Sequence, residues 1–201
     1  YDALIKFKSG NPKPLGSPEW IVEQSVKMFS EISPVTKEFI TFMVECELLD
    51  LHNRKGKTGG GYSTSFIKYK APFIFTNMKG TDSDVTVFLH EAGHALQFYL
   101  CRDYVTSEER NCTSDVDEVH SISMELLTMN YMDLFFGEDT EKFMYNHLVN
   151  SIRSIADNVC GDEFQEIMYL NPELTPEERN KVWLEIRNKY RSGVDYSECD
   201  Y

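Results

Sequence analysis

Apolar residues recur every three or four positions along most of this chain, which is the spacing of one face of an α-helix. The first such stripe contains Val22, Val26 and Phe29. It follows Ser17 and Pro18, which suit a helix start because a serine side chain caps the first turn and proline already has a helical φ angle. The pattern therefore predicts a helix that begins at about residue 18.

The same start signal, Ser33 followed by Pro34, predicts a second helix whose apolar stripe runs through Phe39 and Cys46. The segment 52–61 then reads HNRKGKTGGG. Because it is rich in glycine and positive charge, we expect it to be a loop.

Two short runs after this loop carry the aromatic and β-branched residues that are typical of strands. They are Tyr62–Ile67 and Pro72–Asn77, and the second ends at a turn around Gly80. We expect them to form a small β-hairpin or sheet.

Helical spacing then resumes and predicts three helices, at about 84–101, 115–136 and 138–158. We expect Asp82 or Ser83 to cap the first of them, and the segment 106–114 to form a polar connection. A last helix is predicted from Thr175, where TPEE matches a capping box with proline in the first turn. The fold class is therefore expected to be mainly α.

Composition and charge narrow the class of protein. Of the 201 residues, 41% are hydrophobic, which is typical of a globular chain, and the length suits one domain. The net charge of −13 repels phosphate backbones, so we expect no nucleic acid partner. Because no apolar run is long enough to span a bilayer, we expect no membrane partner either.

The cysteines are odd in number and widely spaced, without a CxxC motif: Cys46, Cys101, Cys112, Cys160 and Cys199. This usage is typical of free thiols in a reducing compartment, so we expect a cytoplasmic location. Cys101 and Cys112 can be interpreted as a disulfide or as metal ligands, but free, partly buried thiols are favoured.

The most informative motif is HEAGH, residues 90–94, inside a long apolar helical pattern. Residues four apart lie on one face of a helix, so His90 and His94 can both bind one zinc ion. Glu91 is offset by one position and is expected to flank the metal as the general base. Chance placement is disfavoured because these polar groups need partners on a buried helix, and because Gly93 costs a helix interior roughly 1 kcal/mol.

A third ligand is expected in the segment DVDEVHSISMELL. Glu118 and Glu125 are seven residues apart and share a helix face, so spacing alone does not choose between them. Asp115 and Asp117 are interpreted as solvated acids at a helix start, where the helix dipole favours negative charge. His120 points away if Glu118 faces the metal.

Several runs together resemble the oligoendopeptidase F branch of the thimet oligopeptidase family of zinc metallopeptidases. They are GNPKPLGSPEWIVEQ, GGGYSTSF, KAPFIFTNMKGTDSDVTVFLHEAGHALQ and DEVHSISMELL. After HExGH this family has a glutamate, a serine three residues later and a second acid seven residues on, which Glu118, Ser121 and Glu125 match. The resemblance implies that Glu118 is the third ligand of one Zn²⁺ per chain, and that Glu125 orients a zinc-bound imidazole.

The resemblance also implies a helical, zincin-like core with a small sheet beside the HExxH helix and a channel for short peptides. The implied function is a zinc-dependent endopeptidase that hydrolyses oligopeptides. A non-catalytic zinc- or peptide-binding helical domain is the alternative.

An extended substrate would then pair with a strand edge through backbone hydrogen bonds. The candidate residues for this edge are Phe73, Ile74, Phe75, Thr76 and Asn77. The alternative is a hairpin that only supports the helix. The glycines at 59–61 form either a mobile loop over the channel or simply a turn.

One departure from the family concerns the end of the chain. The family has a downstream segment rich in histidine and tyrosine that helps to hold the oxyanion, and Tyr196 and Tyr201 do not match it. We therefore expect residues 1–201 to be a single catalytic-core fragment, truncated on its C-terminal side, that binds zinc but cleaves peptides poorly.

Overall fold

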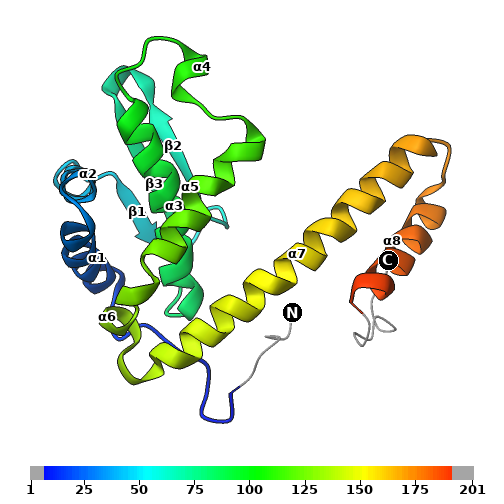
Figure 1. Cartoon of the computed structure of the whole chain (residues 1–201), viewed down its shortest axis with the longest axis horizontal. Helices are drawn as coiled ribbons and strands as arrows, with labels where there is room; N and C mark the ends of the chain where they lie inside the picture. Colours follow the sequence, from blue (N-terminus) through cyan, green and yellow to red (C-terminus); the bar gives the residue numbers. More distant parts are fainter. Residues whose placement is uncertain (1–6, 192–201) are drawn as a thin grey trace. The chain divides into compact units, whose positions relative to one another are not determined.

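The computed structural model describes residues 7–191, and its elements are labelled in Figure 1. The helices are α1 (Pro18–Ile32), α2 (Pro34–Glu45), α3 (Asp82–Cys101), α4 (Ser107–Arg110), α5 (Ser114–Leu127), α6 (Asp133–Phe136), α7 (Thr140–Leu170) and α8 (Pro176–Tyr190). The strands are β1 (Leu49–His52), β2 (Tyr62–Phe66) and β3 (Ala71–Met78). The expected mainly α fold with a small sheet is confirmed. Tyr196, Cys199 and Tyr201 lie outside the described residues.

Most helix starts follow the predicted capping. The side chains of Ser17, Ser33 and Thr175 accept hydrogen bonds from backbone N–H groups in the first turns of α1, α2 and α8. The predicted cap of α3 is wrong, because the helix already begins after Thr81. There Asp84 reaches back and its Oδ2 accepts three backbone N–H groups, at 2.6 to 3.1 Å, which satisfies the orphan donors of this end.

The sheet has the strand order β1-β3-β2, with β1 parallel and β2 antiparallel to β3. Strand β1 was not anticipated, because four residues are too few to show a period. The expectation that Phe73–Asn77 offers a free edge is wrong. Ile74 and Phe75 of β3 pair with β1 on one side and with β2 on the other. Among the described strands, β3 is therefore the middle one and β2 lies at an edge.

The core of the first compact unit, which ends at Met144, surrounds α3. Side chains from α1, α2, β3, α3 and α6 are fully buried there, among them Phe29, Phe39, Ile74, Phe88 and Phe135. Each such side chain stabilises the fold by roughly 1.5–3 kcal/mol relative to exposure. Since α3 lies between the sheet and α5 (Figure 1), the helix that carries HEAGH is held from both sides.

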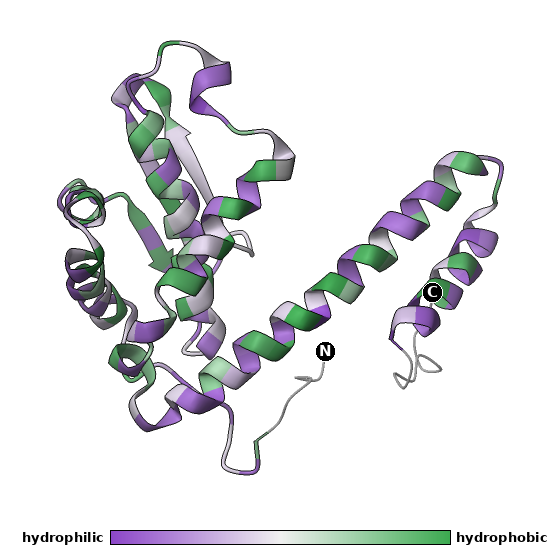
Figure 2. Cartoon of the chain, in the orientation of Figure 1, coloured by the Kyte–Doolittle hydropathy of each residue, from purple (hydrophilic) through white to green (hydrophobic). Residues whose placement is uncertain are grey.

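The second unit begins at Tyr145 and contains most of α7 and all of α8. The two helices lie side by side: the ring of Phe164 packs edge-on against Trp183, and Arg187 donates a hydrogen bond to Asp157 at 2.9 Å. Hydrophobic and hydrophilic residues alternate along α7 (Figure 2), which is typical of an amphipathic helix. The prediction that this helix ends near 158 is wrong, because no cap or proline interrupts it before residue 170. Within residues 7–191, each helix is either too short or too polar to span a lipid bilayer.

The predicted helix at 115–136 is divided into shorter pieces. α5 ends at Leu127, and Thr128 Oγ1 donates to the backbone oxygen of Met124 at 2.8 Å. A 3₁₀ turn follows before α6 begins at Asp133. Side chains that bond back to the preceding turn favour such bends, and this was not visible in the spacing of apolar residues.

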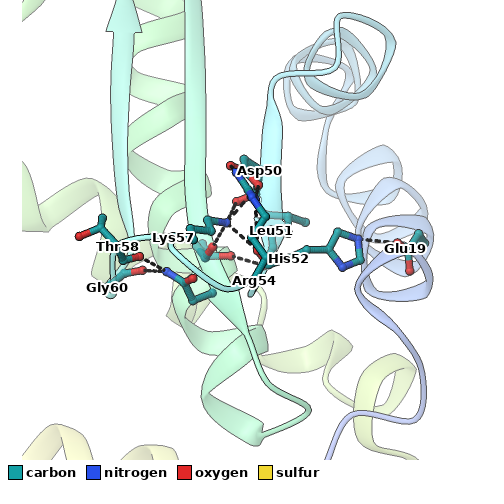
Figure 3. A network of polar contacts seen from close by, with 10 residues as sticks. Glu19, Asp50, Leu51, His52, Arg54, Lys57, Thr58 and Gly60 are labelled. Atoms are coloured by element: carbon teal, nitrogen blue, oxygen red, sulfur yellow. Dashed lines mark hydrogen bonds and ion pairs between the residues drawn. The ribbon is translucent and has the colours of Figure 1, made fainter.

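The loop after β1 is fixed to the sheet by a polar network (Figure 3). Lys57 Nζ donates to the backbone oxygens of Asp50, His52 and Thr76 and to the Asp50 carboxylate. Asn77 Nδ2 holds the other end of the loop by donating to the backbone oxygen of Gly60 at 2.8 Å. The glycine-rich segment is therefore anchored where it enters β2.

We expect Asp50→Asn to lower the free energy of unfolding at neutral pH. The pKa of Asp50 lies far below its ordinary 3.8, chiefly because Arg54 donates a hydrogen bond to the carboxylate. Burial raises this pKa, but the hydrogen bond and the charge of Lys57 lower it further. Because the folded pKa is the lower one, this stabilisation is present above about pH 4 and is lost as the pH falls towards the folded pKa. Urea unfolding over a pH series measures it.

Asp103→Asn is the matched control. Its exposed carboxylate pairs with Lys70 at 2.6 Å, where solvent screens the attraction. We expect a smaller loss of stability there. If Asp50→Asn lowered the free energy of unfolding no more than Asp103→Asn does, or lowered it equally in acid, the stabilising role of the Asp50 carboxylate would be contradicted.

Candidate metal centre

Two neighbouring helices bring three metal-ligand side chains together. His90 and His94 lie one turn apart on α3, and Glu118 lies on α5. The Nε2 atom of His90 is 3.2 Å, and that of His94 3.7 Å, from Oε2 of Glu118. At ordinary bond lengths, a nitrogen and an oxygen on one tetrahedral zinc ion are about 3.3 Å apart. The donor atoms, all within 4.8 Å of one another, are therefore spaced and chemically suited for zinc.

Further polar groups orient these donors. His90 Nδ1 lies 2.7 Å from Oε1 of Glu125. Since an ionised carboxylate only accepts, Nδ1 donates in this contact, so that Nε2 is the atom of the neutral imidazole that can bind a metal. Ser121 Oγ donates to Oε2 of Glu118 at 2.7 Å. Thus Glu118, and not Glu125, lies beside the Nε2 atoms of both imidazoles.

The two helices approach closely because residue 93 is glycine. A Cβ on Gly93 would lie 2.5 Å from the backbone oxygen of His120 and 2.7 Å from Cα of Ser121. Both distances are well inside van der Waals contact, so a side chain would push α5, and Glu118 with it, away from α3. The glycine that weakens the helix locally is explained by this contact.

Glu91 lies under the start of β2 and is only 7% exposed. Its backbone oxygen accepts a hydrogen bond from Ser63 Oγ at 2.7 Å. A Cβ on Gly61 would lie 3.6 Å from Oε1 of Glu91 and 2.9 Å from Val87, so the chain passes directly over this carboxylate. The carboxylate is therefore held next to the histidine pair in a largely desolvated place.

An open pocket of about 400 Å³ is lined by His90, Glu91, His94 and Glu118. A second pocket of about 160 Å³ shares Ser63 with it and continues along β2 to the end of α4. Because Ser63 and Phe98 line both, the two pockets are neighbours along β2 and α3, and together we call them the β2 groove.

The electrostatics of this site favour a cation. Burial lowers the pKa of His90, but the hydrogen bond to Glu125 and the negative charges of Glu125, Glu118 and Glu91 outweigh it, so that the pKa is raised. Carboxylates surround the imidazole ring, and together they would stabilise a positive ion at the same place.

Some residues of the pocket were not anticipated. Asp117, which the sequence suggested to be a solvated acid at a helix start, also lines this pocket; the side chain of Asp115 lies outside the described part. Gln97, which also lines it, is three residues after His94, so the helical period could have indicated it. Ser63 comes from a separate strand and gave no such signal.

Among the described residues, the free thiols are Cys46, Cys101, Cys112 and Cys160. The pKa of Cys112 is raised, first by burial and then by the charges of Asp117 and Cys101. Cys101 is held by Gln97, whose Nε2 lies 3.4 Å from its sulfur.

Comparisons with known proteins identify the family of this chain. The model of Peptidase family M3 matches residues 5–197. Oligopeptidase PepF of Bacillus subtilis (strain 168) is 25% identical over 173 residues, which are 81% of this chain and 26% of PepF. The solved structure of PZ peptidase A with an inhibitor is 47% identical, with a TM-score of 0.93 over 97% of this chain and 35% of that one.

A Bacillus anthracis (strain Ames) structure assigned to oligoendopeptidase F is 45% identical, with a TM-score of 0.90 over 94% of this chain and 35% of that one. The chain thus spans about a third of the length of these structures and a quarter of PepF. The family match extends over nearly all residues, including both segments that carry the His and Glu cluster. The chain therefore belongs to peptidase family M3, and it is similar to the oligoendopeptidase F members of that family along most of its sequence.

Proposed function

We propose that this chain carries the zinc site and general base of an endopeptidase that hydrolyses short oligopeptides. The observation that carries the proposal is the cluster of His90, His94 and Glu118, whose donor atoms lie together in a groove beside an exposed strand edge. Two imidazoles and one carboxylate are a common ligand set of catalytic zinc, which leaves a position open for reaction.

In this proposal each side chain around the cation has a defined task. A bound zinc ion supplies Lewis-acid chemistry, since it acidifies water and polarises a peptide carbonyl. His90, His94 and Glu118 hold the ion. Glu125 keeps the proton on Nδ1 of His90, and Ser121 donates to Glu118, so that both ligands present the correct atom.

Glu91 is the proposed general base. Its carboxylate takes a proton from the attacking water and returns it to the amine of the departing peptide. Its position supports this role, because Glu91 lines the same pocket as the two histidines and Glu118. Glu91 is mostly buried but still reaches the pocket beside the cluster. Such a base favours an enzyme over a domain that only binds zinc or peptides.

We propose that the substrate backbone pairs with β2 rather than with β3. The outer side of β2 has no strand partner among residues 7–191, and Gly61, Tyr62 and Ser63 line the pocket of the His and Glu cluster. Backbone hydrogen bonds to an edge strand accept most side chains, which suits a peptidase for varied short peptides. The free thiols support a reducing, cytoplasmic setting for this reaction.

The test compares Glu118→Ala with Glu125→Ala. We expect Glu118→Ala to lose most of the zinc bound by His90 and His94, because it removes a ligand of that ion. Glu125→Ala should keep the ion but bind it roughly 10–100-fold more weakly, since it only orients His90. Zinc content by elemental analysis, and cleavage of a quenched fluorescent peptide by the full-length protein, measure both effects. Equal zinc retention in the two variants would count against the ligand assignment.

A further inference from the structure

A second group of metal-ligand side chains lies beside the first but takes no part in the proposed reaction. Cys112 stands just before α5, and Asp117 and His120 lie in the first two turns of that helix. A sulfur, a carboxylate oxygen and an imidazole nitrogen from these residues all lie within 4.8 Å of one another. This group, the Cys112 cluster, joins three ligand types that zinc binds in proteins.

The histidine of the cluster is oriented as a ligand. Nδ1 of His120 lies 3.2 Å from the backbone oxygen of Asp117. Because a carbonyl oxygen only accepts, Nδ1 carries the proton and Nε2 keeps its lone pair. That Nε2 faces Cys112, with Sγ at 3.8 Å. Metal-bound histidines commonly donate their other N–H to a carbonyl in this way.

The distance between sulfur and nitrogen is close to that of a coordinated pair. With ordinary Zn–S and Zn–N bond lengths, two such ligands on a tetrahedral ion are about 3.6 Å apart. The observed 3.8 Å therefore requires little movement to admit a cation. The cluster is partly open to solvent, and Asp117 also lines the pocket of the first site, so an ion can enter from the β2 groove.

Contacts from α3 hold the backbone on both sides of the cluster. Gln97 Nε2 donates to the backbone oxygen of Arg110 at 2.9 Å, two residues before Cys112. The backbone of His120 lies directly against Gly93. The ligands are thus supported by the same helix that carries HEAGH, which reduces the ordering needed on binding.

We propose that Cys112, Asp117 and His120 form a second cation site, for a borderline or soft divalent ion such as Zn²⁺ or Co²⁺. It differs from the first site in one decisive way: it contains sulfur, whereas His90, His94 and Glu118 offer only nitrogen and oxygen. Co²⁺ bound to a thiolate shows an intense charge-transfer band in the near ultraviolet. Co²⁺ bound to nitrogen and oxygen shows only weak bands in the visible.

The experiment titrates the metal-free full chain with Co²⁺ and follows both spectral regions. We expect two ions per chain, with the sulfur band growing in proportion to one of them. Cys112→Ser should lose the sulfur band and bind one ion fewer. The matched control Cys46→Ser, which removes an exposed thiol from another part of the molecule, should keep both.

Two further measurements distinguish the Cys112 cluster from the site of His90, His94 and Glu118. Glu118→Ala should weaken the visible bands but keep the sulfur band, so the two proposals can fail independently. In unsubstituted protein, Zn²⁺ should protect Cys112 from alkylation while Cys46 stays reactive, because a coordinated thiolate is a poor nucleophile. Absence of a sulfur band, its survival in Cys112→Ser, or unchanged alkylation of Cys112 would overturn the proposal and leave a simple thiol–imidazole contact.

Discussion

Glu91→Gln is expected to lower kcat for peptide hydrolysis by roughly 10²–10⁴-fold, the range that positioned acid–base groups contribute. Glutamine has nearly the same shape, so it fits the buried position under β2. The glutamine amide cannot accept the proton of the attacking water. The substitution leaves all three proposed metal ligands in place. The zinc content, including the ion in the His90, His94 and Glu118 cluster, should therefore equal that of the unsubstituted protein.

Hydrolysis of a quenched fluorescent peptide by the full-length protein, with elemental analysis of the same samples, measures this result. Glu23→Gln is a suitable control, because it makes the same chemical change at an exposed position on α1. Near-normal turnover in Glu91→Gln would exclude the general-base role. Loss of zinc together with activity would instead assign Glu91 to holding the metal.

Gly93→Ala is expected to damage both stability and zinc binding, although alanine is the better helix former. The new methyl group would lie 2.5 Å from a backbone oxygen of α5, and backbone cannot rotate away as a side chain can. We expect a net loss of about 1–3 kcal/mol, as for other overpacked cores. Zinc affinity should fall roughly 10–100-fold, because Glu118 moves away with α5.

Gly161→Ala is the matched control, since this glycine also lies inside a helix but nothing lies within 4 Å of the added atom. At this position no contact opposes the higher helix propensity of alanine, so we expect Gly161→Ala to raise the free energy of unfolding by up to about 1 kcal/mol. Urea unfolding and zinc titration measure both variants. If Gly93→Ala were as stable as the unsubstituted protein and bound zinc normally, close packing of α3 on α5 would not position Glu118.

The features that could be read from the sequence are local ones. Ser17, Ser33 and Thr175 cap helices as predicted, because a cap depends on residues three or four positions apart. The placement of His90 and His94 on one helix face also follows from helix geometry alone. Both are consequences of the backbone within a single element, so no knowledge of its neighbours was needed.

The tertiary structure decided what depends on contacts between elements. Spacing left Glu118 and Glu125 equivalent, and only the packing of α5 on α3 brings one to the Nε2 atoms and the other to Nδ1 of His90. Strand order made β2, not β3, the edge beside the site. Such contacts join residues distant along the chain, and they arise from how whole faces pack, which no local period contains.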